Sequence, residues 1–219
     1  MKPIILLNPN SSEQVTEGID AAVDPLRALG VPIQCVTLKD GPPGIETQAQ
    51  ADRVIAPMLD LAAGIEASAF VVACFGDPGL HAMRDEMTVP VLGIQECAVM
   101  QALTVGQRFG VIAILERSVP RHYRAFGAMG VLDRLVGDYP LDLTVAELAD
   151  ADRTVARMAE VGQRLRADGA NSIIMGCAGM ARYRAQLEQD IGLPVIEPCQ
   201  AAVGMAITRV TLMGGVQNA

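Results

Sequence analysis

Short, continuous apolar runs recur along the chain, and between them apolar residues return every three or four positions. The runs are uninterrupted rather than alternating with polar residues, which is typical of parallel strands covered on both faces. They predict strands at Ile4–Leu7, Ile33–Leu38, Phe70–Cys74, Val89–Ile94, Val111–Leu115, Ile173–Gly176 and Pro194–Ile196. The periodic stretches predict helices at Ser12–Leu29, Gln48–Gly64 and Leu143–Gly169, the first and last ended by Gly30 and Gly169. This alternation favours an α/β fold with parallel sheets.

The order of these elements occurs twice, with an offset of about 104 residues. Phe70–Gly76 corresponds to Ile173–Gly179, and in both segments the strand is followed by Cys-x-Gly. Pro90–Ile94 corresponds in the same way to Pro194–Pro198, and a helix of small residues follows each. We therefore expect two pseudo-symmetric lobes from an internal duplication, over residues 1–103 and 104–207. A C-terminal helix over 208–219 is expected to pack back on the first lobe.

Composition narrows the class of function. The 219 residues carry a formal charge of −8, which has the wrong sign for a nucleic-acid partner. The longest apolar runs, such as Ala69–Phe75, are far below the roughly 20 residues of a membrane helix. Five cysteines, an odd number with no export signal, indicate reduced thiols in the cytoplasm.

Lysine and histidine are scarce. The sequence has Lys2, Lys39, His81 and His122, and none of them lies in a motif for a Schiff base, a histidine triad or a multi-histidine metal site. We therefore expect no metal and no cofactor, and we place both histidines on helix surfaces. Thiols remain as candidate acid–base groups.

Cys74 and Cys177 are the candidate catalytic residues. Each closes a buried strand, where ligands bind in open α/β sheets, and each precedes a glycine and then a helix. The N-terminus of that helix is expected to lower the pKa of the thiol. Inverting a carbon acid requires a base on one face and an acid on the other, so two like groups on opposite walls of a cleft suit racemisation. Alternatively, each cysteine is a small buried hydrophobe, which is also the default for Cys35, Cys97 and Cys199.

Backbone and polar groups beside these cysteines are candidate substrate contacts. The N–H groups around Phe75-Gly76 and Ala178-Gly179 can hold an enolate oxygen. In the loop Asn8–Glu13, Asn10 with Glu13 predicts a helix cap, while the polar side chains can instead grip a substrate. Ser118 is the counterpart in the second half, as an N-cap or as a hydrogen-bonding group.

Three segments resemble the hydantoin racemase branch of the aspartate/glutamate racemase superfamily: Asn8–Ser12, Ala73–Leu80 and Met175–Met180. The resemblance implies a cofactor-independent racemase with two α/β lobes, a substrate between them, and Cys74 and Cys177 as the acid–base pair. It also implies a homo-oligomer. The aspartate and glutamate racemases follow their cysteines with Asn-Thr and Thr-Glu, which this sequence lacks.

We therefore expect a neutral flat ring as substrate, a 5-substituted hydantoin or allantoin. The expected substrate-binding residues are Asn8, Ser11, Phe75, Gly76, Ser118, Ala178 and Gly179. Three alternatives remain: an aspartate/glutamate-type racemase, a malonate decarboxylase or isomerase on the same scaffold, and a two-lobed ligand-binding module without chemistry.

Overall fold

A computed structural model describes the backbone of residues 1–216 and the side chains as far as Met213. The first half comprises β1 Ile4–Asn8, α1 Glu13–Val23, β2 Ile33–Thr37, α2 Gln48–Arg53, α3 Ile55–Ala63, β3 Ala69–Val72, α4 Leu80–Glu86, β4 Val91–Gly93 and α5 Ile94–Val105. The second comprises β5 Phe109–Ala113, α6 Val119–Ala128, β6 Leu135–Pro140, α7 Ala151–Ala167, β7 Ser172–Met175, α8 Arg184–Ile191, β8 Val195–Ile196 and α9 Pro198–Val216. Short 3-10 helices are η1 Asp24–Leu29, η2 Glu116–Ser118, η3 Leu132–Arg134, η4 Glu147–Ala149 and η5 Ala178–Tyr183.

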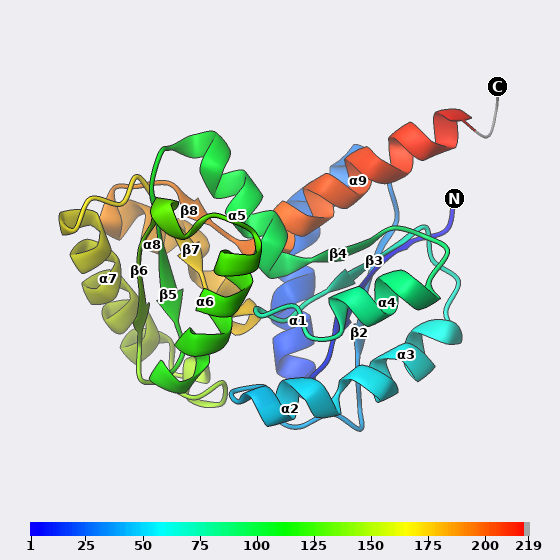
Figure 1. Ribbon diagram of the computed structural model, residues 1–219, viewed down its shortest axis with the longest axis horizontal. Helices are drawn as coiled ribbons and strands as arrows, with labels where there is room; N and C mark the ends of the chain where they lie inside the picture. The colour runs from blue at the N-terminus through cyan, green and yellow to red at the C-terminus, as the bar shows by residue number, and fades with distance from the viewer. Residues whose placement is uncertain (217–219) are drawn as a thin grey trace.

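The strands form two parallel four-stranded sheets with the same order. The first is β2-β1-β3-β4 and the second is β6-β5-β7-β8 (Figure 1). The central strands of both sheets are buried on both faces, as their uninterrupted apolar runs predict. The expected α/β fold with two similar lobes is confirmed.

Alternate residues of each central strand belong to different cores. Ile5 and Leu7 of β1 pack with Met58 of α3 on the outer face of the first sheet. Ile4 and Leu6 belong to a central core that also contains residues of the second sheet. The outer face of the second sheet has its own core, covered by α7 and α8.

Two helices join the lobes. The helix α5 leaves the first sheet and contacts β5, β7 and β8 of the second, whereas α9 leaves the second sheet and contacts β1, β3 and β4 of the first. The two helices also pack on each other, and Figure 1 shows α9 running along the first lobe. The domain boundaries at 103 and 207 stay a prediction, and residues 217–219 of the expected terminal helix lie outside the described residues.

The predicted helices are too long in three places. Pro25, which has no N–H to donate, ends α1, and the chain continues as η1. The stretch Gln48–Gly64 divides into α2 and α3 at Val54. The expected helix from Leu143 begins only at Ala151, because the Asp150 carboxylate caps α7 by accepting from the Arg153 N–H.

The strand β6 was not predicted at all. Its sequence Leu-Val-Gly-Asp-Tyr-Pro mixes apolar, polar and turn-favouring residues, which gives no strand-like run. It lies at the edge of the second sheet, where its terminal proline and its partly exposed side chains are tolerated.

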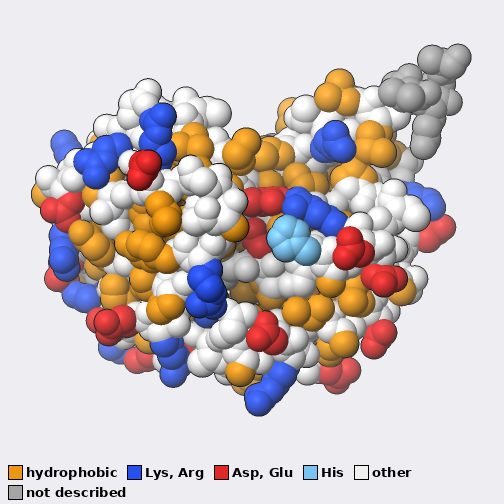
Figure 2. Space-filling view, in the orientation of Figure 1, with side chains coloured by type: hydrophobic (Ala, Val, Ile, Leu, Met, Phe, Trp, Pro, Cys, Tyr) orange, Lys and Arg blue, Asp and Glu red, His pale blue; other side chains and the backbone are white. Residues whose placement is uncertain are grey.

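Figure 2 shows acidic and basic side chains interspersed over the viewed face, as expected for a chain with 25 acidic and 17 basic residues. Within the described part of the chain, no helix has both the length and the apolar character to cross a membrane.

Candidate active site

Loops from the carboxyl ends of β1, β3, β5 and β7 meet around one small cavity. Residues from both repeats line it, as expected for a site between the two lobes. The lining residues are Asn10, Val15, Ile45, Ala73, Cys74, Phe75, Ile114, Arg121, Val145, Gly176, Cys177, Ala178 and Gly179. The cavity has a volume of about 20 Å³, which is room for about one water molecule. The site is therefore narrow in this conformation, and both of its cysteines are half-buried.

The two candidate cysteines lie in this cavity together. Each follows the end of its strand by two residues, after β3 and after β7. They are close enough that ionisation of Cys177 would raise the pKa of Cys74. The predicted convergence of the matched cysteines is thus what the fold produces, and all five cysteines of the chain are free thiols.

Burial controls the ionisation of both thiols. It raises the pKa of Cys74 from its ordinary value near 9.0 to about 12, although the nearby Arg121 guanidinium acts in the opposite direction. It raises the pKa of Cys177 to about 11, opposed first by the Gly179 N–H and then by Arg121. That N–H donates to the Cys177 Sγ at 3.4 Å.

The expectation that helix N-termini lower the thiol pKa values was wrong. Helix α4 begins only at Leu80, six residues after Cys74, and only the 3-10 turn η5 follows Cys177 directly. Desolvation of the thiols outweighs the single N–H donor that the second motif supplies.

Arg121 is the site residue that sequence reasoning missed. It lies in the first turn of α6, a helix whose bounds were not predicted, and its side chain reaches the cavity that contains both thiols. Its Nη2 donates to the Ile45 carbonyl oxygen at 3.4 Å. Its Nε and Nη1 atoms are buried, and neither has a hydrogen-bond partner among the described residues.

The glycines after the cysteines differ in position. Phe75, Ala178 and Gly179 line the cavity as expected. Gly76 is not a lining residue; it has φ +105°, and a Cβ there would lie 3.1 Å from the Arg121 Nε. Gly76 therefore allows both the turn after Cys74 and the close approach of the guanidinium.

The loop after β1 presents Asn10 rather than Asn8 to the cavity. The Asn8 side chain is buried, and its Nδ2 donates to Asn10 Oδ1, Ser12 O and Thr16 Oγ1, which stabilises the loop. The N-cap was predicted at Asn10, but it is Ser12, whose side chain accepts from the Val15 N–H. Asn10 Oδ1 instead accepts from the Ser12 N–H.

Ser118 does not line the cavity. It is fully buried and its Oγ donates to the Leu115 carbonyl oxygen at 2.6 Å. It stands at the start of α6 without making a side-chain cap. Its structural role is to stabilise the turn that carries Arg121.

The two histidines behave differently. His81 is exposed on α4, as predicted. The prediction for His122 was wrong: it is fully buried, and its Nδ1 lies 2.7 Å from Asp138 Oδ2. Asp138 belongs to β6, the strand that the sequence did not reveal, so the polar partner of His122 was hidden too. The His122 ring packs edge-on against Phe75 behind the site, with ring centroids 4.9 Å apart.

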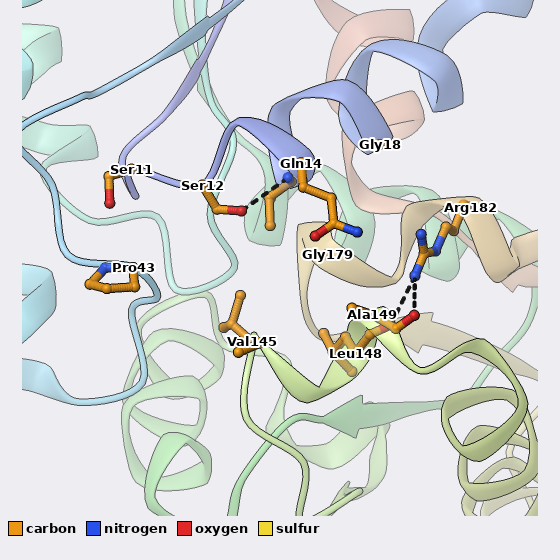
Figure 3. A pocket seen from close by; sticks show the side chains of 12 residues that line it. Ser11, Ser12, Gln14, Gly18, Pro43, Val145, Leu148, Ala149, Gly179 and Arg182 are labelled. Atoms are coloured by element: carbon orange, nitrogen blue, oxygen red, sulfur yellow. Dashed lines mark hydrogen bonds between the residues drawn. The ribbon is translucent and has the colours of Figure 1, made fainter.

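A larger pocket of about 330 Å³ adjoins the cavity on the side of Cys177 (Figure 3). Both share Val15, Val145 and Gly179 as lining residues. A Cβ at Gly179 would lie 3.5 Å from Cys177 Sγ and 3.1 Å from Leu148 Cδ1, so this glycine separates the thiol from the pocket. We call this space the outer pocket; Ser11, Ser12, Gln14 and Arg182 are its polar side chains.

Segment 45–48 of the first lobe closes over the cavity through contacts with the second. Glu46 accepts from the Val145 N–H and pairs with Arg117. Gln48 Oε1 accepts from Arg124 Nη2 at 2.6 Å. These contacts connect the lobes at the rim of the site. Among the described residues, no group of three or more histidine, cysteine or acidic side chains is placed to hold a metal ion.

Comparison with known proteins gives concordant matches over almost the whole chain. Residues 4–206 match the model of the family described as Asp/Glu/Hydantoin racemase. The hydantoin racemase of Paenarthrobacter aurescens is 30% identical over 215 residues, which cover 95% of this chain and 91% of the relative. That of Rhizobium meliloti is 34% identical and covers 93% of this chain and 86% of the relative.

Among solved structures, allantoin racemase from Klebsiella pneumoniae superposes with a TM-score of 0.90 at 31% identity. The match covers 97% of this chain and 89% of that chain. The fold of two four-stranded sheets is therefore an arrangement that this chain shares with a solved racemase.

Proposed function

The chain belongs to the Asp/Glu/hydantoin racemase family, and we propose that it is an isomerase that inverts C5 of a hydantoin-type ring without a cofactor. The substrate would be a 5-substituted hydantoin or allantoin, the ring systems named in the most similar relatives. One observation carries the proposal: two cysteines from matched positions of the two lobes line a single narrow cavity. That is the arrangement a two-base inversion needs.

The proposed reaction moves one proton at a time. One cysteine, as the thiolate, removes the C5 proton, and the electron pair of the C–H bond passes to the adjacent carbonyl, forming a planar enolate. The other cysteine, as the thiol, donates its proton to the opposite face of C5, and the carbonyl re-forms. Starting from the other enantiomer reverses the two roles. The narrow cavity has room for about one water molecule, and this low hydration strengthens polar interactions with the enolate.

The wall of the cavity suits a flat ring. Phe75, Ala178 and Gly179 occupy the positions beside the thiols, and they offer an aromatic face, a methyl group and backbone N–H groups rather than charged side chains. We propose that the ring lies between the thiols and that its C5 substituent extends past Gly179 into the outer pocket. The outer pocket is the adjoining space with room for a substituent.

Amino-acid racemisation is the second candidate, and Arg121 is the observation that favours it. A guanidinium with two unpaired N–H groups also suits the carboxylate of aspartate or glutamate. Both substrates are therefore included in the test below. Assembly into a homo-oligomer and a reducing, cytoplasmic location are further proposals, which light scattering of the purified protein and fractionation of the source cells would test.

The deciding experiment follows a single enantiomer of 5-benzylhydantoin, allantoin, aspartate or glutamate in D₂O, with optical rotation and deuterium at the stereocentre as readouts. We expect racemisation with one solvent deuteron per inversion for a hydantoin, and loss of both signals in Cys74→Ser and in Cys177→Ser. Cys35→Ser is the matched control, because this half-buried thiol lies outside the cavity. Full activity in either cavity variant would refute the two-thiol mechanism.

A further inference from the structure

Three arginines lie in the segment 117–124, and the structure uses them differently. Arg117 pairs with Glu46, and Arg124 donates to Gln48, so both bind the first lobe at the rim of the site. Arg121 points into the cavity instead. In the described part of the chain, no carboxylate lies within ion-pair distance of Arg121.

The guanidinium of Arg121 is held in place but not saturated. Its Nη2 is oriented by the Ile45 carbonyl oxygen, while Nε and Nη1 are buried without a partner. Buried donors in native proteins are almost always paired, because an unpaired one is costly. A pair of such donors beside two thiols therefore indicates a position at which a ligand atom completes the hydrogen bonds.

The local backbone is also built around this side chain. Gly76, two residues after Cys74, lies close to the Arg121 side chain. A Cβ at Gly76 would lie 3.1 Å from Nε and 3.6 Å from Cδ of Arg121. On the other wall, the positive charge lowers the pKa of Cys177 as well as that of Cys74. The guanidinium is thus near both thiols rather than paired with one of them.

From this placement we propose that Arg121 is a catalytic residue that binds the carbonyl oxygen next to C5 and stabilises the enolate; the proposal rests on the hydantoin racemase function above. When the C5–H bond breaks, its electron pair is delocalised onto that oxygen, and an N–H group of Nη1 donates a hydrogen bond to the developing charge. The guanidinium stays protonated throughout, because its pKa is too high for it to take part in proton transfer. The charge returns to carbon when the second thiol protonates C5.

The test compares Arg121→Met and Arg121→Lys with Arg157→Met, a control at an arginine of α7 that pairs with Glu160 and lines neither the cavity nor the outer pocket. Initial rates of racemisation of enantiopure 5-benzylhydantoin are measured from pH 6 to 9. For Arg121→Met we expect kcat/KM to fall about 100- to 1000-fold, most of it in kcat, as for loss of one oxyanion donor. Arg121→Lys should recover part of this loss, since it restores the charge without the fixed, planar N–H groups of the guanidinium. Arg157→Met should stay within about threefold of wild type.

Two further readouts separate catalysis from folding. Alkylation of Cys74 and Cys177 by iodoacetamide should become slower at a given pH in Arg121→Met, because the thiolates lose a nearby cation. Guanidinium chloride at low millimolar concentration should raise the rate of Arg121→Ala but not that of Cys177→Ser.

The outcomes are distinguishable. If the wild type racemises the hydantoin and Arg121→Met keeps at least a third of its kcat/KM, the proposal for Arg121 is overturned while the proposed function stands. An equal loss in Arg157→Met and Arg121→Met, without guanidinium rescue, also overturns it. If the wild type exchanges no C5 proton of any hydantoin or of allantoin, both proposals fail.

Discussion

Gly179→Ala tests the proposed path of the C5 substituent from the cavity into the outer pocket. The added methyl group would lie 3.5 Å from Cys177 Sγ, 3.1 Å from Leu148 Cδ1 and 4.0 Å from Val15 Cγ2. All three contacts are with side-chain atoms, and Gly179 lies in η5 without a positive φ. Leu148 can yield by a few tenths of an ångström, so we expect the free energy of unfolding to change by less than about 1 kcal/mol.

The expected effect is on substrate choice. One methyl group added to or removed from a binding pocket changes the transition-state free energy by about 1–3 kcal/mol, or roughly 10–200-fold in kcat/KM. For 5-benzylhydantoin, whose substituent must pass Gly179, we expect a loss of about 10–100-fold. For 5-methylhydantoin, whose substituent ends before the passage, we expect a change of less than about threefold.

The assay is the initial rate of loss of optical rotation for the single enantiomers of both hydantoins, with thermal unfolding as the check on folding. Gly127→Ala is the control, because a Cβ there makes only an ordinary contact at 3.6 Å with Leu132. Equal slowing of both substrates would show that the methyl group disturbs the Cys177 thiol itself. No slowing of the benzyl compound would show that the substituent leaves the cavity by another route. Either result would refute the assignment of the outer pocket.

Four further predictions concern ionisation and packing. Below pH 9, kcat/KM should rise about tenfold per pH unit, because burial holds the pKa values of the two cavity thiols at about 11 and 12; a plateau in the pH–rate profile below pH 8 would contradict this. Because the pKa values of both thiols are higher in the folded protein than in the unfolded chain, the free energy of unfolding should fall as the pH rises from 9 toward 11, which urea unfolding at several pH values would measure. Gly162→Ala should lower the free energy of unfolding, measured in urea, by about 1–3 kcal/mol, because the new Cβ would lie 2.0 Å from Ile191 Cδ1. Gly18→Ala has open space around the new Cβ, and it should raise the free energy of unfolding by about 0.4–1 kcal/mol. Asp138→Ala should cost about 1–3 kcal/mol, measured by thermal unfolding, since it leaves buried His122 without its partner; an unchanged melting temperature would contradict that.

Local sequence predicts the fold here because most strands are buried on both faces. Continuous apolar runs mark seven of the eight strands, and only β6, with Gly137 and Asp138 at its centre, lacks the signal. The placement of Cys74 and Cys177 in one cavity could be predicted because the repeat places them at equivalent strand ends. It needs only the order of elements and not the orientation of side chains.

Sequence reasoning missed residues whose role depends on the direction in which the side chain points. Whether Asn8 or Asn10 faces the cavity is decided by the Asn8 amide, which donates to Ser12 O and Thr16 Oγ1 and so turns away from the cavity. Whether Arg117, Arg121 or Arg124 faces it depends on where α6 begins. The thiol pKa values were predicted in the wrong direction for a similar reason, since burial depends on how completely the lobes close.

The symmetry of the fold matches the symmetry of the proposed reaction only in part. Proton transfer occurs on both faces of C5, and the repeat supplies it with two equivalent cysteines. The enolate oxygen and the substituent each occur once in the substrate, and they require groups that the repeat does not duplicate. After β5, α6 contributes Arg121 to the cavity, whereas after β1 the corresponding helix α1 contributes Val15. The outer pocket adjoins the Cys177 side of the cavity. A duplicated pair of thiols with single-copy binding groups is what inversion of an asymmetric ring requires, and a twofold-symmetric cavity would leave the ring free to bind in two orientations.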